Sequence, residues 1–359
     1  MNEDTPARGS DVVKQYEKYK RRKVFVGIFL AAALFALAVY SLCLGSMRIS
    51  IGQIIAAFMR NGDKVHEVII WNIRFPRIWE AIIAGMSLSL SGCAMQCTLR
   101  NPLAAPFTIG VSQSAGFGAA FAIIVLGSVS AHNTALPAVL NNPYTVVLCA
   151  FIASFACILT ILLLAKFARL SSQAMVLAGV AMGTLFSAAT MLLQYFAEDV
   201  KVASVIFWTF GDMGRAGKAD VLIMFAVLIP ALIYFMSNRW EYNALESGEE
   251  TAKALGVNTE RLRLVSILMA SLVTSVSVAF LGIIGFIGLI APHITRRIVG
   301  SDYRYLIPIS AVFGSVLLLA ADTVSRTILS PAMLPVGILT SFMGAPLFIY
   351  LILKKRKSY

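Results

Sequence analysis

Few residues in this sequence have the types and spacing that catalysis or ligand binding requires. The stretch GDMGRAGKA (residues 211–219) has the glycines and lysine of a phosphate-binding loop, but the spacing is wrong and Ala219 stands where Ser or Thr would bind magnesium. Cys93 and Cys97 share a helix face, yet no histidine or carboxylate accompanies them to complete a metal site. We therefore predict no metal, no cofactor and no catalytic residue in this chain, which is not an enzyme.

A short charged segment, LESGEETAKALGVN (residues 245–258), interrupts the apolar sequence. Ser247 and Glu250, three residues apart, predict a capping box in which each side chain satisfies a free backbone N–H of the other residue. Glu249 and Glu250 favour the positive end of the helix dipole, and Gly256 supplies a left-handed stop. A helix of about two turns is not stable alone in water, so it must pack against its own protein or against a partner.

The elements that carry these residues are membrane helices. Of the 359 residues, 58% are hydrophobic and 13% charged, and the mean hydropathy of +0.81 lies outside the range of soluble proteins. A bilayer core about 30 Å thick requires about 20 apolar residues per helix, so the apolar runs predict an all-α, polytopic membrane protein with ten transmembrane helices. The predicted spans are residues 24–44, 78–97, 105–127, 143–165, 172–194, 221–237, 264–281, 283–299, 305–321 and 335–353.

The basic residues orient these spans. With ten spans and a cytosolic N-terminus, most of the 30 Lys and Arg residues are cytosolic, whereas omitting the eighth span removes this bias. We therefore predict a multi-pass protein of the cytoplasmic (inner) membrane with both termini in the cytosol. Residues 1–23 are a cytosolic tail, either mobile or helical at the interface, and residues 24–359 are one transmembrane domain that includes the cytosolic loop 241–261. The formal charge of +12 is then a topology signal and does not indicate nucleic acid.

Three arginines lie at the predicted outer ends of spans, where basic residues oppose the orientation rule. Arg74 and Arg77 precede the second span, and Arg326 follows the ninth. They either reach lipid phosphates or pair internally, with Asp322 one turn from Arg326, or they present cations to an acidic external partner.

Several long blocks occur in the order found in one family of membrane proteins. They are IRFPR (73–77), SGCAMQCTLRNPLAAPFTIGV (91–111), LESGEETAKALGV (245–257), GFIGLIAPHITRRIVG (285–300), AADTVSR (320–326) and LPVGILTSFMGAPLF (334–348). Through them the chain from Val24 onward resembles the iron-chelate and vitamin B12 permeases (FecCD and BtuC-like), the membrane subunits of type II ATP-binding-cassette (ABC) importers. That family usually has an acidic residue before LPVG, where this chain has Met333, so no role is carried over to that position.

The resemblance implies a BtuC-like fold, pairing with a second copy of the chain, and two ABC ATPase subunits that bind the ATP and magnesium. It implies that each ATPase docks on a coupling helix formed by Ser247, Gly248, Glu249, Glu250, Ala252, Ala254, Leu255 and Gly256. It also implies that an extracytoplasmic substrate-binding protein docks at Arg74, Arg77 and Arg326. Four further positions match the inner gate of the family, although the residues themselves also suit ordinary turns: Asn101, Leu103, Ser171 and Ser172.

The expected function is that of a permease subunit that translocates a metal chelate and is driven by a separate ATPase. Ferric siderophore is the first choice of cargo, with haem or cobalamin as the other possibilities. The alternative is an ion-coupled secondary transporter, but the central parts of the spans lack the Asp or Glu that such a carrier ordinarily needs. A membrane enzyme has no supporting cluster of His, Cys and carboxylate residues.

Overall fold

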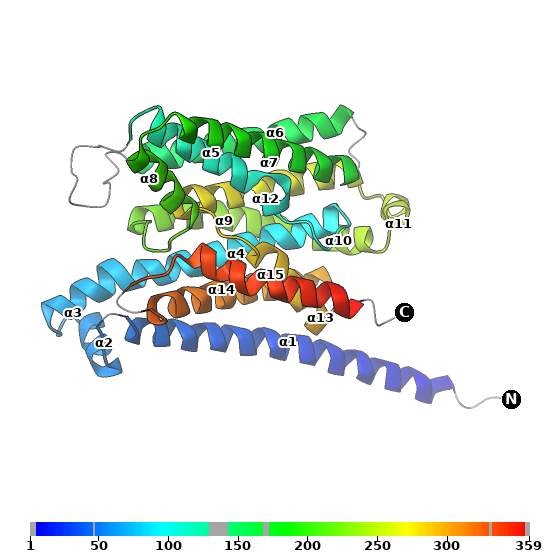
Figure 1. Cartoon of the computed structure of the whole chain (residues 1–359). Helices are drawn as coiled ribbons and strands as arrows, with labels where there is room; N and C mark the ends of the chain where they lie inside the picture. The colour runs from blue at the N-terminus through cyan, green and yellow to red at the C-terminus, as the bar shows by residue number, and fades with distance from the viewer. Residues whose placement is uncertain (1–4, 46, 129–142, 168–171, 330–331, 356–359) are drawn as a thin grey trace.

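The computed structural model describes residues 5–45, 47–128, 143–167, 172–329 and 332–355, which are helical and contain no strand. Figure 1 shows the long helices lying side by side, with short helices at both ends of the bundle. The helices are α1 Thr5–Cys43, α2 Ile51–Phe58, α3 Lys64–Val68, η1 Ile69–Arg74, α4 Phe75–Thr98, η2 Pro106–Ile109, α5 Val111–Ile124, α6 Pro143–Phe167, α7 Ser172–Tyr195, α8 Asp199–Thr209, α9 Lys218–Ser237, α10 Arg239–Glu246, α11 Glu249–Ala254, α12 Thr259–Leu281, α13 Ile287–Val299, α14 Tyr303–Thr327 and α15 Val336–Lys355.

Each of the ten predicted spans corresponds to one helix, which confirms the all-α, polytopic prediction. These helices are α1, α4, α5, α6, α7, α9, α12, α13, α14 and α15. Within the described ranges, seven helical stretches are long and apolar enough to cross a membrane, and the apolar parts of α5 and α15 are shorter.

The predicted eighth span, residues 283–299, begins with four non-helical residues before α13 starts. The 13 residues of α13 extend about 20 Å at about 1.5 Å per residue, which is less than the thickness of a bilayer core. Non-helical backbone at membrane depth must be buried in protein or line a cavity, because lipid offers no hydrogen bonds. Here Ile284 is 4% exposed, and Gly337 of α15 packs directly on the carbonyl of Ile283.

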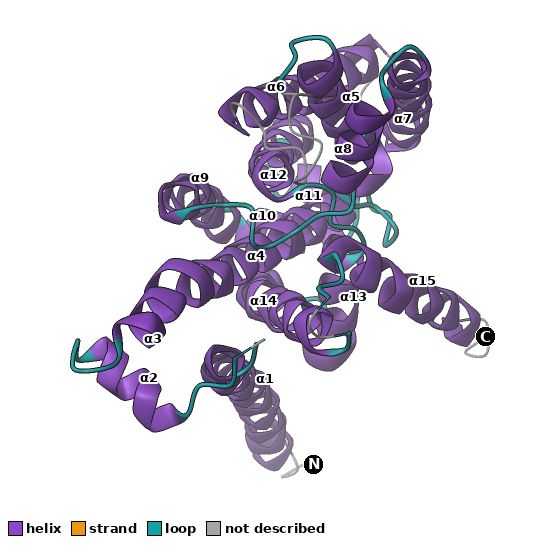
Figure 2. Cartoon of the chain, turned by 60° about the vertical axis from the view of Figure 1, so that its left-hand side comes forward, coloured by secondary structure: helices purple, strands orange, loops and turns teal. Residues whose placement is uncertain are grey.

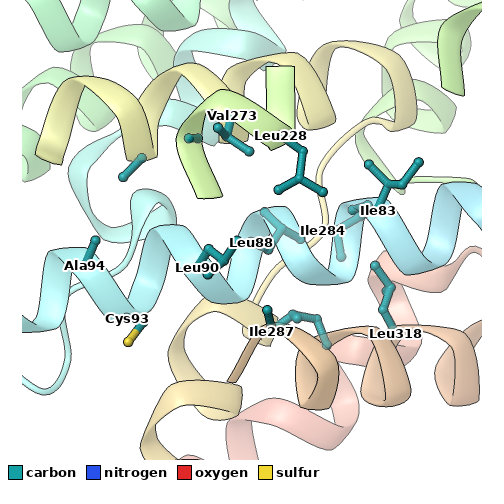
Figure 3. Packing of buried hydrophobic residues seen from close by; sticks show 14 of the residues in the cluster. Ile83, Leu88, Leu90, Cys93, Ala94, Leu228, Val273, Ile284, Ile287 and Leu318 are labelled. Atoms are coloured by element: carbon teal, nitrogen blue, oxygen red, sulfur yellow. The ribbon is translucent and has the colours of Figure 1, made fainter. Parts of the chain in front are cut away.

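Helix α4 forms the centre of the bundle, and most of its side chains are buried. Figure 3 shows how neighbouring helices converge on it: Leu228 of α9, Val273 of α12, Ile287 of α13 and Leu318 of α14 point toward Ile83, Leu88 and Leu90 of α4. This arrangement holds the two ends of α4 at fixed positions between four other helices.

Small residues allow this close packing. A Cβ atom added at Gly92 would lie 1.6 Å from the carbonyl oxygen of Gly288, so α4 and α13 cross with their backbones in contact. Serine hydroxyls add bonds between helices: Ser89 donates to the Ser310 carbonyl at 2.6 Å, and Ser91 to the Ala270 carbonyl at 2.8 Å. In a bilayer, where lipid is as apolar as leucine, such contacts replace the hydrophobic effect between helices.

The predicted tail, residues 1–23, is not separated from the first span. Helix α1 begins at Thr5 and continues without a break to Cys43. Lys23, at the predicted boundary, is 3% exposed, and its ammonium lies 4.1 Å from the centre of the Tyr19 ring and 4.0 Å from Asp302. The start of α1, the end of α15 and α11 lie at one end of the bundle in Figure 1, whereas α2, α3 and α8 lie at the other. Figure 2 shows that α1 and the group of α5, α6, α7 and α8 lie on opposite sides of the bundle.

Candidate functional site

The predicted coupling segment consists of two short helices joined at Gly248. Helix α10 ends at Glu246, α11 runs from Glu249 to Ala254, and α12 starts at Thr259. Gly248 has φ +130° and Gly256 has φ +82°, which are conformations that favour glycine. The left-handed stop predicted at Gly256 is therefore confirmed, and the second helix is held between two glycine joints.

The predicted capping box at Ser247 and Glu250 is wrong. Ser247 lies at the end of α10, where its hydroxyl donates to the Asn243 carbonyl at 3.2 Å, and the residue before α11 is Gly248, which offers no side-chain cap. A serine hydroxyl can bond to the carbonyl four residues earlier, and here that local alternative prevails over capping the next helix. Glu250 instead points to solvent, with 93% of its side chain exposed and its carboxylate 3.7 Å from the Lys253 ammonium.

The other carboxylate of this segment, Glu249, faces the bundle. It accepts a hydrogen bond from the Arg263 guanidinium of α12 at 3.1 Å and lies 3.5 Å from Lys253. Burial alone would raise the pKa of Glu249, but the positive charges of Arg263 and Lys253 outweigh it and hold this pKa below its usual value. Of the remaining predicted coupling residues, Ala252 is buried and Leu255 is 68% exposed, so the segment presents both an anchored face and a free face.

The predicted gate residue Asn101 lies in a tight turn after α4. Its side-chain oxygen accepts the backbone N–H of Leu103 at 2.9 Å, and its carbonyl accepts the N–H of Ala104 at 3.0 Å. Arg100, the residue before it, has φ +47°. The alternative interpretation of these residues as a turn is therefore correct, and the gate role of Asn101 and Leu103 stays a prediction.

Residues of this turn line two cavities. A cavity of about 970 Å³ with a mixed polar and apolar lining includes Asn101 and Ser172 together with Glu249 and Arg263, so it joins two predicted gate residues to the coupling segment. An apolar cavity of about 380 Å³ is lined by Leu103 and by residues of α4, α12, α13 and α15. Ser171, the fourth predicted gate residue, lies outside the described residues.

The three outer arginines are buried. Arg74 is 5% exposed and donates to the carbonyls of Leu42 and Met47, which close the turn after α1. Arg77 and Arg326 are 8% and 6% exposed, and both bind Asp322, which is fully buried. Internal ion pairing is therefore observed for Arg77 and Arg326, whereas Arg74 binds backbone carbonyls, and the docking role of all three arginines stays a prediction.

Asp322 uses its two oxygens for the two guanidinium groups. The Arg77 Nε donates to Oδ1 at 3.0 Å, and the Arg326 Nε donates to Oδ2 at 3.1 Å. Arg77 also lies 3.3 Å from Asp212 in the loop before α9, and Arg326 donates to the Leu44 carbonyl at 3.2 Å. The network thus joins α4 and α14 to two loops at the end of the bundle opposite α11.

Glu80 of α4 is a residue that the sequence reasoning missed. Its side chain is 1% exposed, and its Oε2 has no hydrogen-bond partner among the described residues. It stands three residues after Arg77, near the start of the predicted second span. A carboxylate one turn from an arginine at the edge of a span was the available signal, because ionisable residues within spans are rare.

Known proteins share both the sequence and the fold. The profile of the FecCD transport family matches residues 33–354. A protein of Methanocaldococcus jannaschii that carries the name of an ABC transporter permease protein is 56% identical over 97% of this chain and 99% of its own length. The hemin transport system permease protein HmuU of Yersinia pestis is 36% identical over 80% of this chain and 84% of its own length.

A solved structure gives the same result for the fold. The structure of a metal-chelate type ABC transporter in an inward-facing conformation matches with a TM-score of 0.80 and 32% sequence identity, and the match covers 92% of this chain and 99% of that one. The BtuC-like fold expected from the sequence is therefore confirmed. Since the family profile covers most of the chain, this protein belongs to the FecCD transport family.

Proposed function

We propose that this chain is the permease subunit of an ABC importer that moves a metal chelate across the cytoplasmic membrane. The observation that carries the proposal is the α10–α11 segment, a charged, partly exposed pair of helices at one end of the bundle, beside the cavity that Asn101 and Ser172 line. A helix of six residues with its second carboxylate almost fully exposed is suited to a polar partner. Because the chain carries no phosphate-binding loop, a separate ATPase supplies the energy.

The proposed assembly contains two copies of this chain, two ATPase subunits and one substrate-binding protein. Each ATPase, with its ATP and magnesium, grips one coupling segment from Ser247 to Gly256. The binding protein docks at the opposite end of the bundle, where the buried arginines Arg74, Arg77 and Arg326 hold the surrounding loops in place. In this proposal the arginines fix the shape of the docking face, and the loops that they hold in place contact the binding protein.

Ferric siderophore remains the first choice of cargo, with haem and cobalamin as alternatives. The apolar lining of the 380 Å³ cavity suits a bulky ligand that must pass without being held by strong polar contacts. One relative carries the name of a hemin permease, and one related structure that of a metal-chelate transporter. Both names support the chelate class and leave the choice within it to experiment.

Transport by the reconstituted complex tests the proposal. The chain would be purified with its ATPase and binding protein, placed in proteoliposomes, and assayed for uptake of ferrichrome, hemin and cyanocobalamin. We expect uptake of one of these chelates that requires ATP and resists an uncoupler. The competing function is an ion-coupled carrier, for which the buried carboxyl group of Glu80 is the supporting observation. Uptake by the chain alone that an uncoupler abolishes would establish that carrier and overturn the ABC assignment.

A further inference from the structure

Helices α10 and α11 are attached to the bundle in different ways. In α10, Tyr242 is fully buried and its hydroxyl lies 2.7 Å from that of Ser266 in α12. Glu246 at the end of α10 binds Arg296 of α13, and it also accepts the Tyr303 hydroxyl of α14 at 3.3 Å. Helix α10 is therefore fixed to three helices of the bundle.

Helix α11 has far fewer attachments. It lies between the two glycine joints at Gly248 and Gly256, and its one fully buried side chain is that of Ala252. The ion pairs of Lys253 with Glu249 and Glu250 stay within α11. In the part of the chain that the structure describes, the bond from Glu249 to Arg263 is the one ion pair that joins α11 to another helix. A displacement of α11 would therefore pull or push mainly on Arg263.

Arg263 also bonds to the end of α4. While its Nη2 binds Glu249 at 3.1 Å, its Nε donates to the carbonyl of Thr98 at 3.0 Å. Thr98 is the last residue of α4, and the turn with Asn101 follows directly. Arg263 is 5% exposed and Thr98 is fully buried, so the part of the path from Arg263 to Thr98 runs through the protein interior.

The guanidinium group is suited to transmit a displacement. It is planar and always charged, and it presents its donors in a rigid fork, so a shift of one bound group changes the direction of the other bond. Hydrogen bonds to an ionised partner are also about twice as strong as neutral ones, so the bond between Glu249 and Arg263 resists separation when α11 moves. Glu249 and Arg263 line the same 970 Å³ cavity as Asn101 and Ser172. The residues at the start of the path and two of the predicted gate residues thus line one cavity.

We propose that Arg263 is a positioning residue that transmits movement of α11 to the turn of residues 99–104. Movement of the ATPase tilts α11 about Gly248 and Gly256 while α10 stays in place. Glu249 then shifts the Arg263 guanidinium, which draws on the carbonyl end of α4 and reorients Asn101 and Leu103. This inference rests on the proposed function, because the ATPase is the source of the movement.

Hydrogen–deuterium exchange of residues 99–104 tests this path without knowledge of the cargo. The chain, alone and with its ATPase, would be studied in nanodiscs with and without magnesium and a non-hydrolysable ATP analogue. Four variants are compared with the unchanged chain: Arg263→Gln, Arg263→Lys, Glu249→Gln and, as the matched control, Arg261→Gln. Arg261 lies on α12 outside the coupling segment, two residues before Arg263, and it is exposed and makes no ion pair among the described residues. An Arg263→Lys variant keeps the charge and loses the fork.

We expect nucleotide to change the exchange of residues 99–104 at least threefold in the unchanged chain and in Arg261→Gln, and to leave it unchanged in Arg263→Gln and Glu249→Gln. Arg263→Lys should restore part of the response, and Arg263→Gln should bind the ATPase with unchanged affinity. A full response in Arg263→Gln, or no response in the unchanged chain with ATPase bound, would overturn the path. If Arg263→Gln does not fold, a full nucleotide response in Glu249→Gln would overturn the path instead. If no ATPase binds the unchanged chain, the proposed function itself fails.

Discussion

Replacement of Gly92 by alanine tests the packing that holds α4 at the centre of the bundle. A Cβ atom at this position would lie 1.6 Å from the carbonyl oxygen of Gly288 and 2.5 Å from its carbonyl carbon, whereas ordinary contacts begin at 3.4 Å. Both of these atoms are backbone atoms that cannot rotate away. Helices α4 and α13 must therefore move apart by almost 2 Å, which is roughly the difference between the 1.6 Å distance to the Gly288 oxygen and the 3.4 Å at which ordinary contacts begin.

The cost of this separation can be estimated from its parts. Overpacking a close-packed interior costs about 1–3 kcal/mol, and more when backbone must move. The Gln96 side chain, which donates to the Leu289 carbonyl at 3.1 Å across the same pair of helices, loses its partner at a further cost of about 1 kcal/mol. Alanine recovers about 1 kcal/mol through its higher helix propensity. The last two contributions cancel, so we expect the free energy of unfolding to fall by about 1–3 kcal/mol.

The assay is thermal unfolding of the purified chain in detergent, followed by tryptophan fluorescence. Gly116→Ala in α5 is the matched control, because its Cβ would meet nothing closer than the Ile283 Cδ1 at 3.8 Å. The control should unfold at the same temperature as the unchanged chain or slightly above it, and Gly92→Ala several degrees below. Equal midpoints for the two alanine variants would refute the reasoning.

Three further predictions concern the ends of the bundle. Asp322→Asn leaves Arg77 and Arg326 buried without their shared carboxylate, so thermal unfolding should show a loss of about 3 kcal/mol, and a loss no larger than that of Asp212→Asn would contradict it. In Gly256→Ala the added Cβ meets no atom within 4 Å, so backbone strain alone should lower the local stability of α11 by about 1 kcal/mol. Amide exchange in α11 should therefore be faster, and exchange as slow as in the unchanged chain would contradict this prediction. Glu249 has a depressed pKa in the folded chain, so its contribution is present above the usual value near 4.5 and is lost as pH falls through the lower, folded value. Amide exchange of residues 249–254, corrected for its intrinsic pH dependence, should therefore rise at acidic pH, and an equal rise in Glu249→Gln would disprove the role of this carboxylate.

The sequence was sufficient for features that depend on local composition. Apolar runs of about 20 residues predicted most of the membrane helices, because burial in lipid requires continuous apolar helix regardless of which neighbours it meets, and the distribution of basic residues added the eighth span. The conformation of Gly256 was also predictable, since a helix stop of this kind needs a residue that tolerates positive φ. Asp322 and Arg326, four residues apart, could be paired from helix geometry alone.

Features that depend on distant residues were not available from the sequence. Arg77 meets Asp322 across 245 positions, and Arg263 meets Thr98 across 165 positions, so no local pattern indicates either contact. The capping box failed for a related reason, because the Ser247 hydroxyl had two local partners of similar strength and the spacing could not rank them. Composition and periodicity thus determined which segments enter the membrane and where they stop. The tertiary structure alone decided which charges are buried and what they hold, because a charge leaves water only where folding brings a partner to it.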